Sequence, residues 1–175
     1  MNYFISYLIA GFLALAEPSI FYDSTHKSLV YKSDKNEVKL SLKIPPNMKF
    51  ENTPKYFSDD SLGYIVADLA GSDVATALLI AVDKLGKTIW SIDLEAFNAS
   101  SPLIEKKYIY ISGIGKVFKI NKTDGKIIWT HSGLYDNHNY RFNGSENIQI
   151  KNGVVYFSEK VRVNNNSGEL LGANK

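Results

Sequence analysis

The side chains best suited to chemistry in this chain are three histidines and one adjacent pair of carboxylates. His26, His131 and His138 each lack a second metal-ligating residue two to four positions further along. No His-Glu-x-x-His motif occurs, so we predict no metal site. Asp59 and Asp60 have no recognisable glycosidase context, and we interpret the pair as part of a solvated turn.

Other reactive motifs are also missing from the sequence. The chain contains no cysteine, which excludes a disulfide framework, a cysteine-ligated zinc site and a thiol nucleophile. There is no Gly-x-Ser-x-Gly elbow, and the glycines at 113 and 115 do not precede a helical pattern. We therefore predict no catalytic residues and no cofactor, which favours a non-catalytic protein over an enzyme.

One long loop combines aromatic, charged and amide side chains and is the candidate binding site. Its candidate residues are Tyr135, Asp136, His138, Tyr140 and Arg141. Loops held by a rigid β scaffold are frequent binding sites, which favours this one. Two alternatives remain, a solvated connection without function and a carbohydrate site, the latter supported only by aromatic and amide content.

The first residues have the pattern of an export signal. An apolar run from Tyr3 to Leu15 ends in Ala14-Leu15-Ala16, a small-x-small pattern that signal peptidase accepts. We predict a signal peptide over 1–16 and an exported domain over 17–175, periplasmic or secreted. The alternatives are an uncleaved anchor and a buried first strand. Charged or polar residues interrupt every later apolar run, so no stable membrane span is expected after cleavage.

The overall charge excludes one class of partner. The chain has 20 basic and 18 acidic residues, a net charge of +2, without a basic block, so nucleic-acid binding has no electrostatic support. A composition that is 45% hydrophobic and 13% aromatic, rich in Tyr and Phe, suits strands rather than disorder. The length suffices for one domain with its own core.

The elements that must position any site are predicted to be strands. Val117–Ile120 and Lys126–Trp129 alternate in polarity around a polar stretch that ends in Asp124-Gly125, a strong hairpin signal. Gly63–Leu69 and Ala75–Val82 form a similar pair. Residues 48–61 are polar and contain a proline, and we expect a loop there. No segment has a helical period of ten or more residues, so the chain is predicted to be all-β.

The same pattern recurs about every 40 residues. Gly86 and Trp90 recur as Gly125 and Trp129, and a weaker third copy contains Gly168 but no tryptophan. We predict that each glycine provides the positive φ of a tight turn and that each tryptophan packs between neighbouring units. A period of about 40 residues with about four short strands is typical of a β-propeller blade.

These residues resemble a known family. Asn121-Lys122-Thr123-Asp124-Gly125-Lys126-Ile127-Ile128-Trp129 is similar to the repeat of pyrroloquinoline-quinone-like (PQQ-like) propellers, and the resemblance covers about residues 63–172. Three departures are visible: Asn121 replaces the usual Asp, the turn before Gly86 is one residue shorter, and Gly172 occupies the third tryptophan position. The resemblance implies an all-β propeller of about three to four blades, and we favour a partial propeller over the alternative of a compact four-bladed ring. The open edges of a partial propeller would favour self-association.

The resemblance also implies two functions. The first is an exported, non-catalytic scaffold that binds protein partners, like the periplasmic propeller of outer-membrane protein assembly, through strand edges or inter-blade loops. The alternative is a fragment of a quinoprotein dehydrogenase that oxidises alcohols or sugars with quinone and calcium. Those enzymes use an adjacent cysteine pair, which this chain lacks. The first function is therefore favoured.

Overall fold

The computed structural model describes residues 18–23, 28–33, 36–40, 44, 47–135, 141–144 and 147–172. Within these ranges the chain forms strands, turns and loops and no helix, which confirms the all-β prediction. The predicted signal peptide over 1–16 lies outside the described residues. None of the described residues belongs to a helix that could cross a membrane.

The described strands form four antiparallel sheets that follow one another in chain order. The first sheet contains β1 (Ser19–Asp23), β2 (Ser28–Lys32) and β3 (Glu37–Leu40). The second contains β4 (Lys49–Phe50), β5 (Lys55–Ser58), β6 (Gly63–Ala70), β7 (Ala75–Val82) and β8 (Thr88–Asp93). The third contains β9 (Leu103–Ile104), β10 (Tyr108–Gly113), β11 (Lys116–Asn121) and β12 (Ile127–Ser132). The fourth contains β13 (Gln149–Lys151), β14 (Val154–Tyr156), β15 (Arg162–Asn164) and β16 (Leu170–Gly172).

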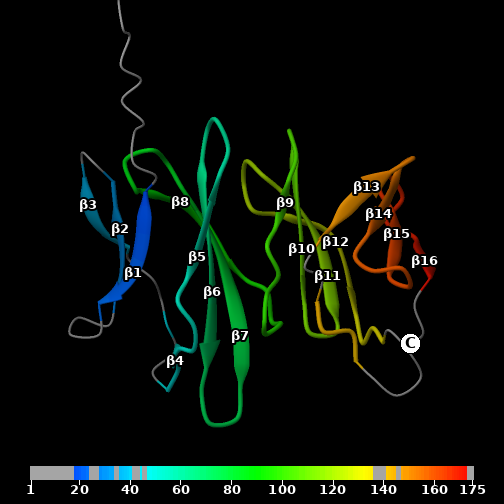
Figure 1. Ribbon diagram of the computed structural model, residues 1–175, viewed down its shortest axis with the longest axis horizontal. Coiled ribbons are helices and arrows are strands. Elements are labelled where there is room, and N and C mark those ends of the chain that lie inside the picture. The colour runs from blue at the N-terminus through cyan, green and yellow to red at the C-terminus, as the bar shows by residue number, and fades with distance from the viewer. Residues whose placement is uncertain are drawn as a thin grey trace, which may run out of the picture.

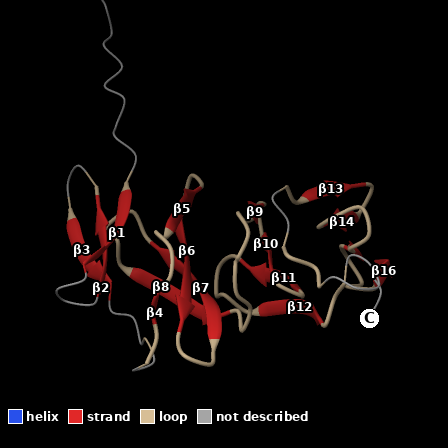
Figure 2. Ribbon diagram, turned by 60° about the horizontal axis from the view of Figure 1, so that its bottom comes forward, coloured by secondary structure: helices blue, strands red, loops and turns tan. Residues whose placement is uncertain are grey.

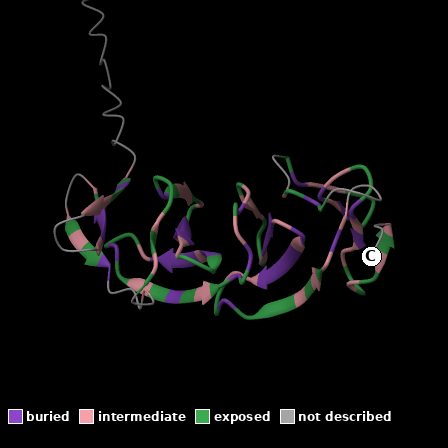
Figure 3. Cartoon of the chain, turned by 90° about the horizontal axis from the view of Figure 1, so that it is seen from below, coloured by how far each residue is buried: buried purple, intermediate pink, exposed green. Residues whose placement is uncertain are grey.

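The four sheets stand side by side, from the blue first sheet to the orange and red fourth sheet (Figure 1). Turning the molecule shows that strands succeed one another within each sheet, as from β9 to β12 (Figure 2). Seen from below, the sheets follow an arc with exposed residues along its convex side (Figure 3). Successive four-stranded sheets along an arc are the architecture of propeller blades. The structure is therefore a partial propeller, as the repeat predicts.

The segment 48–61, expected to be a loop, contains two short strands. β4 and β5 pair in succession with β6, so they share one position in the second sheet. Asp59 closes the hairpin from β5 to β6, because its Oδ1 accepts hydrogen bonds from the backbone N–H groups of Ser61 (2.8 Å) and Leu62 (2.9 Å). The prediction was wrong because Pro54 and the acidic pair are turn signals that outweigh such short strands.

Three hydrophobic cores hold the sheets together, one between each consecutive pair. The first lies between the first and second sheets and contains Leu29, Tyr31 and Ile80. The second joins the second and third sheets through Tyr64, Trp90 and other residues, and the third core surrounds Tyr110 between the third and fourth sheets. Most of the apolar area buried on folding therefore lies between sheets, not within them.

The last turn of the second, third and fourth sheets has one repeated design. The side-chain oxygen of its first residue accepts a hydrogen bond from the backbone N–H two positions later, and its carbonyl accepts one from the turn glycine. These first residues are Asp83, Asn121 and Asn164, and the glycines are Gly86, Gly125 and Gly168. Asn in place of Asp keeps the same acceptor, and the turn that is one residue shorter keeps both bonds.

Each of these three sheets also has a β-bulge directly after that turn. In the third sheet Lys119 pairs with Trp129 and Ile120 with Ile127, which leaves Ile128 as the extra residue. The register shifts of the second and fourth sheets leave Ile89 and Leu171 in the same way. The extra residue at a bulge is unpaired, and its side chain does not follow the alternation between the two faces of the sheet. The three bulge side chains are 42–49% exposed.

Candidate functional site

The repeated glycines and tryptophans meet at the junctions between sheets. Gly125 has a φ of 71°, and a Cβ there would lie 2.8 Å from the indole of Trp90 in the preceding sheet. Gly168, with a φ of 73°, is covered by Trp129 in the same way. Gly86, with a φ of 82°, is covered by Tyr31. Glycine is required at these turns both for the positive φ and for the close approach of a ring.

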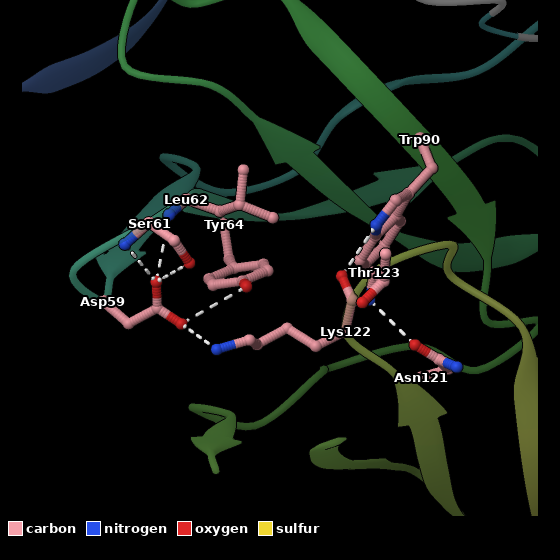
Figure 4. Close-up of polar contacts among 8 residues, drawn as sticks. All are labelled: Asp59, Ser61, Leu62, Tyr64, Trp90, Asn121, Lys122 and Thr123. Atoms are coloured by element: carbon pink, nitrogen blue, oxygen red, sulfur yellow. Dashed lines mark hydrogen bonds and ion pairs between the residues drawn. The ribbon is translucent and has the colours of Figure 1, made fainter. Parts of the chain in front are cut away.

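The junction between the second and third sheets contains a chain of polar contacts (Figure 4). The indole Nε1 of Trp90 donates a hydrogen bond to the Lys122 carbonyl oxygen at 3.0 Å. The ammonium of Lys122 forms an ion pair of 2.7 Å with Asp59 Oδ2, and the Tyr64 hydroxyl lies 3.5 Å from the same oxygen. One residue of the β11–β12 turn thus bonds both to β8 and to the β5–β6 turn of the second sheet.

The ion pair is largely shielded from solvent, with side-chain exposures of 18% for Lys122 and 21% for Asp59. Burial by itself raises the pKa of Asp59. The hydrogen bonds from Lys122, Leu62 and Ser61 outweigh that effect and hold the pKa of this carboxyl well below its usual range. Burial and the nearby Asp59 charge raise the pKa of Tyr64 far above its usual value. At neutral pH Asp59 is therefore a carboxylate and Tyr64 a neutral phenol.

The junction between the third and fourth sheets uses the equivalent turn differently. The carbonyl oxygen of Asn165, at the position of Lys122, accepts a hydrogen bond from Lys119 Nζ at 2.7 Å. Asn165 Oδ1 accepts two more, from the Tyr110 hydroxyl at 2.7 Å and from Lys119 Nζ at 2.9 Å. Lys119 also lies 4.1 Å from the ring centre of Tyr108, and burial lowers its pKa. Trp129 Nε1 is buried and has no hydrogen-bond partner among the described residues.

Apart from Trp129 Nε1, the polar groups described at both junctions therefore bond to one another and join neighbouring sheets. The carboxylate Asp59, predicted to be solvated, is instead the partner of Lys122, while Asp60 is exposed. The described residues contain no group of three His, Cys, Asp or Glu side chains that could hold a metal ion. His131 uses Nε2 to contact the Gly168 carbonyl oxygen at 2.8 Å, which is a further link between sheets.

The predicted binding loop is described only at its two ends. Tyr135 and Arg141 lie opposite each other as an isolated antiparallel bridge, supported by a hydrogen bond from Phe142 N to the Leu134 carbonyl oxygen at 3.0 Å. Asp136, His138 and Tyr140 lie outside the described residues. The structure thus brings the two ends of the loop together, and its binding role stays a prediction.

A polar hollow of about 420 Å³ lies close to this loop. Its walls carry amide, hydroxyl and ammonium groups from Lys55, Asn98, Ser100, Ser101 and Asn143. Asn98 has a φ of 54°, which is tolerated by Asn better than by most residues. Sequence reasoning missed this hollow because its residues come from segments separated along the chain.

Comparison with known proteins decides the family. Residues 53–175 match the family model of the outer membrane protein assembly factor BamB. The chain belongs to this family. The PQQ-like resemblance of the repeat is thereby confirmed, and the segment 53–175 includes the second sheet from β5 onward and the third and fourth sheets.

Solved structures and curated proteins add little to this family assignment. The WD40 domain of SCAP from fission yeast is 14% identical with a TM-score of 0.35, over 89% of this BamB-family chain. The match covers 44% of the SCAP chain, so this chain spans less than half of that structure. No curated protein matches the sequence.

The outer edge of this BamB-family chain carries a row of exposed aliphatic side chains. Ile89, Ile128 and Leu171 are the bulge residues of three successive sheets, and they are 46%, 49% and 42% exposed. Ile127 beside them is 44% exposed. We call Ile89, Ile128 and Leu171 the outer-edge row. The local hairpin signals predict these strands, but the bulges that turn these side chains outward leave no local signal.

Proposed function

We propose that this chain is an exported, non-catalytic propeller module that binds a protein partner during the assembly of outer-membrane proteins. The observation that carries the proposal is the match of residues 53–175 to the BamB family, whose description names that process. The proposed location is the periplasm, where such a module meets unassembled outer-membrane proteins. The predicted signal at 1–16 is consistent with this location.

We assign the partner contact to the outer-edge row. Exposed aliphatic side chains repeated over neighbouring sheets offer an apolar surface that a partner could cover. The bulges interrupt the free edge of each outer strand, and a bulged edge is a poor template for another strand. We therefore favour contact through the side chains of Ile89, Ile128 and Leu171 over the addition of a partner strand.

The quinoprotein dehydrogenase alternative is not favoured. The matched family is described as an assembly factor, and the chain lacks the adjacent cysteine pair that the resemblance to those enzymes would imply. Asp59 and Lys122, the two charged side chains at the junction between the second and third sheets, are already paired with each other. A dehydrogenase would need carboxylates available to a ligand.

Site-specific photo-crosslinking in living cells tests this proposal. A photoreactive phenylalanine analogue replaces Ile128 in one strain and Val74 in a control strain. Val74 is also an exposed aliphatic residue, at 62%, but it lies at the tip of the β6–β7 hairpin, outside the outer-edge row. We expect crosslinks from position 128, and not from position 74, to a protein of outer-membrane assembly or to an unfolded outer-membrane protein. Identical crosslinks from both positions, or none from 128, would contradict the proposal.

A functional measurement accompanies the crosslink. Ile128→Asp is expected to lower the abundance of folded outer-membrane proteins, since a carboxylate in an apolar contact must be desolvated. Val74→Asp is the matched control and should leave that abundance unchanged. Cell fractionation and the N-terminal sequence of the mature chain test the export and the processing after Ala16.

A further inference from the structure

The polar hollow lies beside the core between the second and third sheets. Lys55, at the start of β5, pairs with Val66, and Val66 belongs to that core, so the Lys55 side chain stands on the same face of the second sheet. Residues 98–101 of the connection from β8 to β9 and residues 143–144 of the connection from β12 to β13 complete the wall. The hollow is therefore shared by the second sheet and by the connections that precede and follow the third.

The connection from β8 to β9 is fixed from two sides. Asp68 of β6 is 6% exposed, and its Oδ1 accepts a hydrogen bond from Ala99 N at 3.1 Å. Ser112 of β10 accepts from Ser100 N at 2.8 Å through its carbonyl oxygen, and its own N donates to Ser100 Oγ at 3.1 Å. Asn98 precedes these two anchored residues and has a φ of 54°. This part of the wall is preorganised, so little conformational freedom is lost when a ligand binds there.

The connection from β12 to β13 comes close to this fixed wall. A Cβ at Gly144, whose φ is 86°, would lie 3.5 Å from the Asn98 carbonyl oxygen. Asn143 lies opposite Ile114 in an isolated antiparallel bridge, and Ile114 N donates to the Phe97 carbonyl oxygen at 2.9 Å. Backbone contacts thus hold Asn98 and Asn143 at the same hollow.

The side chains of the wall offer mainly hydrogen-bond donors. Lys55 contributes an ammonium with three donors and no acceptor, and the amides of Asn98 and Asn143 contribute two donors each. The hydroxyls of Ser100 and Ser101 can each donate one more. A group of oxygen acceptors with a negative charge is the ligand that this set of donors suits best.

The charges around the hollow favour a ligand with a single negative charge. None of the described wall residues is acidic, and Lys55 has no ion-pair partner among the described residues. Asp68 follows Val66 by two positions in β6 and lies on the same face as Lys55, so its carboxylate disfavours a second negative charge nearby. A carboxylate fits this balance better than a phosphate group, which carries a charge of about −1.5 to −2 at pH 7.

We propose that the polar hollow binds a carboxylate, with the Lys55 ammonium as its ion-pair partner and the side chains of Asn98, Ser101 and Asn143 as hydrogen-bond donors. The volume of about 420 Å³ exceeds that of a carboxylate group alone and falls within the usual range of about 300–1,000 Å³ for ligand sites. The carboxylate therefore belongs to a larger ligand, either a small organic acid or a polypeptide. β5 and β8 are opposite edges of the second sheet, so this site is separate from the outer-edge row and does not depend on the proposed partner contact.

NMR titration of the purified chain tests the site. N-acetylglycine should shift the amide signals of Ala99, Ser100 and Gly144 saturably, with a dissociation constant of about 0.1–10 mM, and its neutral counterpart N-acetylglycinamide should not. Tighter binding of an acetylated tripeptide than of N-acetylglycine would identify a polypeptide as the source of the carboxylate, and equal binding would identify a small acid. An amidated tripeptide with one glutamate shows whether a side-chain carboxylate serves as well as a terminal one.

Three outcomes of these titrations would overturn the proposal. They are the absence of saturation by every carboxylate probe at about 50 mM, equal binding of N-acetylglycinamide, and tighter binding of inorganic phosphate than of N-acetylglycine. Binding of N-acetylglucosamine without binding of any carboxylate would assign the hollow to a carbohydrate instead.

Variants locate the binding in the hollow. Lys55→Gln should raise the dissociation constant about fivefold or more, and Asn143→Asp should do the same because it places a second carboxylate beside the bound one. Both side chains are exposed, so both variants should fold. Lys49→Gln is the matched control, because Lys49 is an exposed lysine of β4 in the same sheet but outside the wall. Unchanged binding by both wall variants, or an equal loss in Lys49→Gln, would contradict the assignment.

Discussion

The ion pair between Asp59 and Lys122 gives the sharpest test of how the sheets are held together. Asp59 Oδ2 accepts from Lys122 at 2.7 Å, while Oδ1 accepts from two backbone N–H groups and from the Ser61 hydroxyl at 2.7 Å. In Asp59→Asn the side-chain NH₂ group takes the place of one carboxylate oxygen. Whichever way the amide is turned, this NH₂ group faces a donor, either Lys122 Nζ or the donors of Ser61 and Leu62. A hydrogen bond to a charged group contributes about 1.5–3 kcal/mol. With a fifth of the carboxylate side chain exposed, we expect a loss of about 2 kcal/mol.

Urea unfolding at pH 7 measures this loss. With a slope of about 2 kcal/mol per molar urea, the midpoint should fall by about 1 M. Asp60→Asn is the matched control, because the neighbouring carboxylate is exposed, and its effect should stay within about 0.5 kcal/mol.

The pH dependence of this stability loss distinguishes an electrostatic contribution of Asp59 from a contribution of its packing. The folded-state pKa of Asp59 lies below its unfolded value of about 4, so the unfolded chain binds the proton more tightly. The stabilisation is therefore complete above that unfolded pKa and is lost as the pH falls towards the lower folded value. The difference between wild type and Asp59→Asn should shrink from pH 7 to about pH 3. An equal difference at both pH values would refute the electrostatic explanation.

Two further comparisons test the junctions. Gly125→Ala should destabilise the chain more than Gly153→Ala, by about 1–3 kcal/mol in urea unfolding. Both positions have positive φ, but a Cβ at 125 meets an indole 2.8 Å away, whereas a Cβ at 153 meets nothing within 4 Å. Equal losses of stability would show that backbone strain alone accounts for the effect of both substitutions. Trp90→Phe should cost about 1 kcal/mol more than Trp129→Phe, because Trp90 Nε1 donates to the Lys122 carbonyl oxygen and Trp129 Nε1 has no partner among the described residues. Equal thermal unfolding shifts would count against a contribution from that bond.

Local signals predicted most of the strands and all three repeated turns. The alternation before Asn121 and the glycine at 125 report on residues that are neighbours in the chain, and short-range patterns of this kind survive folding. The segment with β4 and β5 failed because two and four residues are too few to show alternation against a proline and two aspartates.

Local sequence patterns could not predict the contacts between sheets. Asp59 and Lys122 are 63 positions apart, and nothing in either hairpin indicates that one side chain will reach the other. The outer-edge row escaped for a related reason, because a β-bulge changes which face a side chain occupies without changing the alternation of the sequence. The position of a residue in the repeat shows which face its side chain occupies only once the pairing register of the strands is known.

The three separate cores have a consequence for the dynamics of the chain. Since each core joins only two consecutive sheets, the free energy of the array is a sum of sheet stabilities and nearest-neighbour couplings. Among the described residues, the second and third sheets each take part in two of these cores, whereas the first and fourth sheets each take part in one. Amide hydrogen exchange should therefore be slowest in β6, β7, β10 and β11 and faster towards both ends. Opening would proceed inward from the ends one sheet at a time, and any contact that covers an end sheet would slow exchange throughout the array.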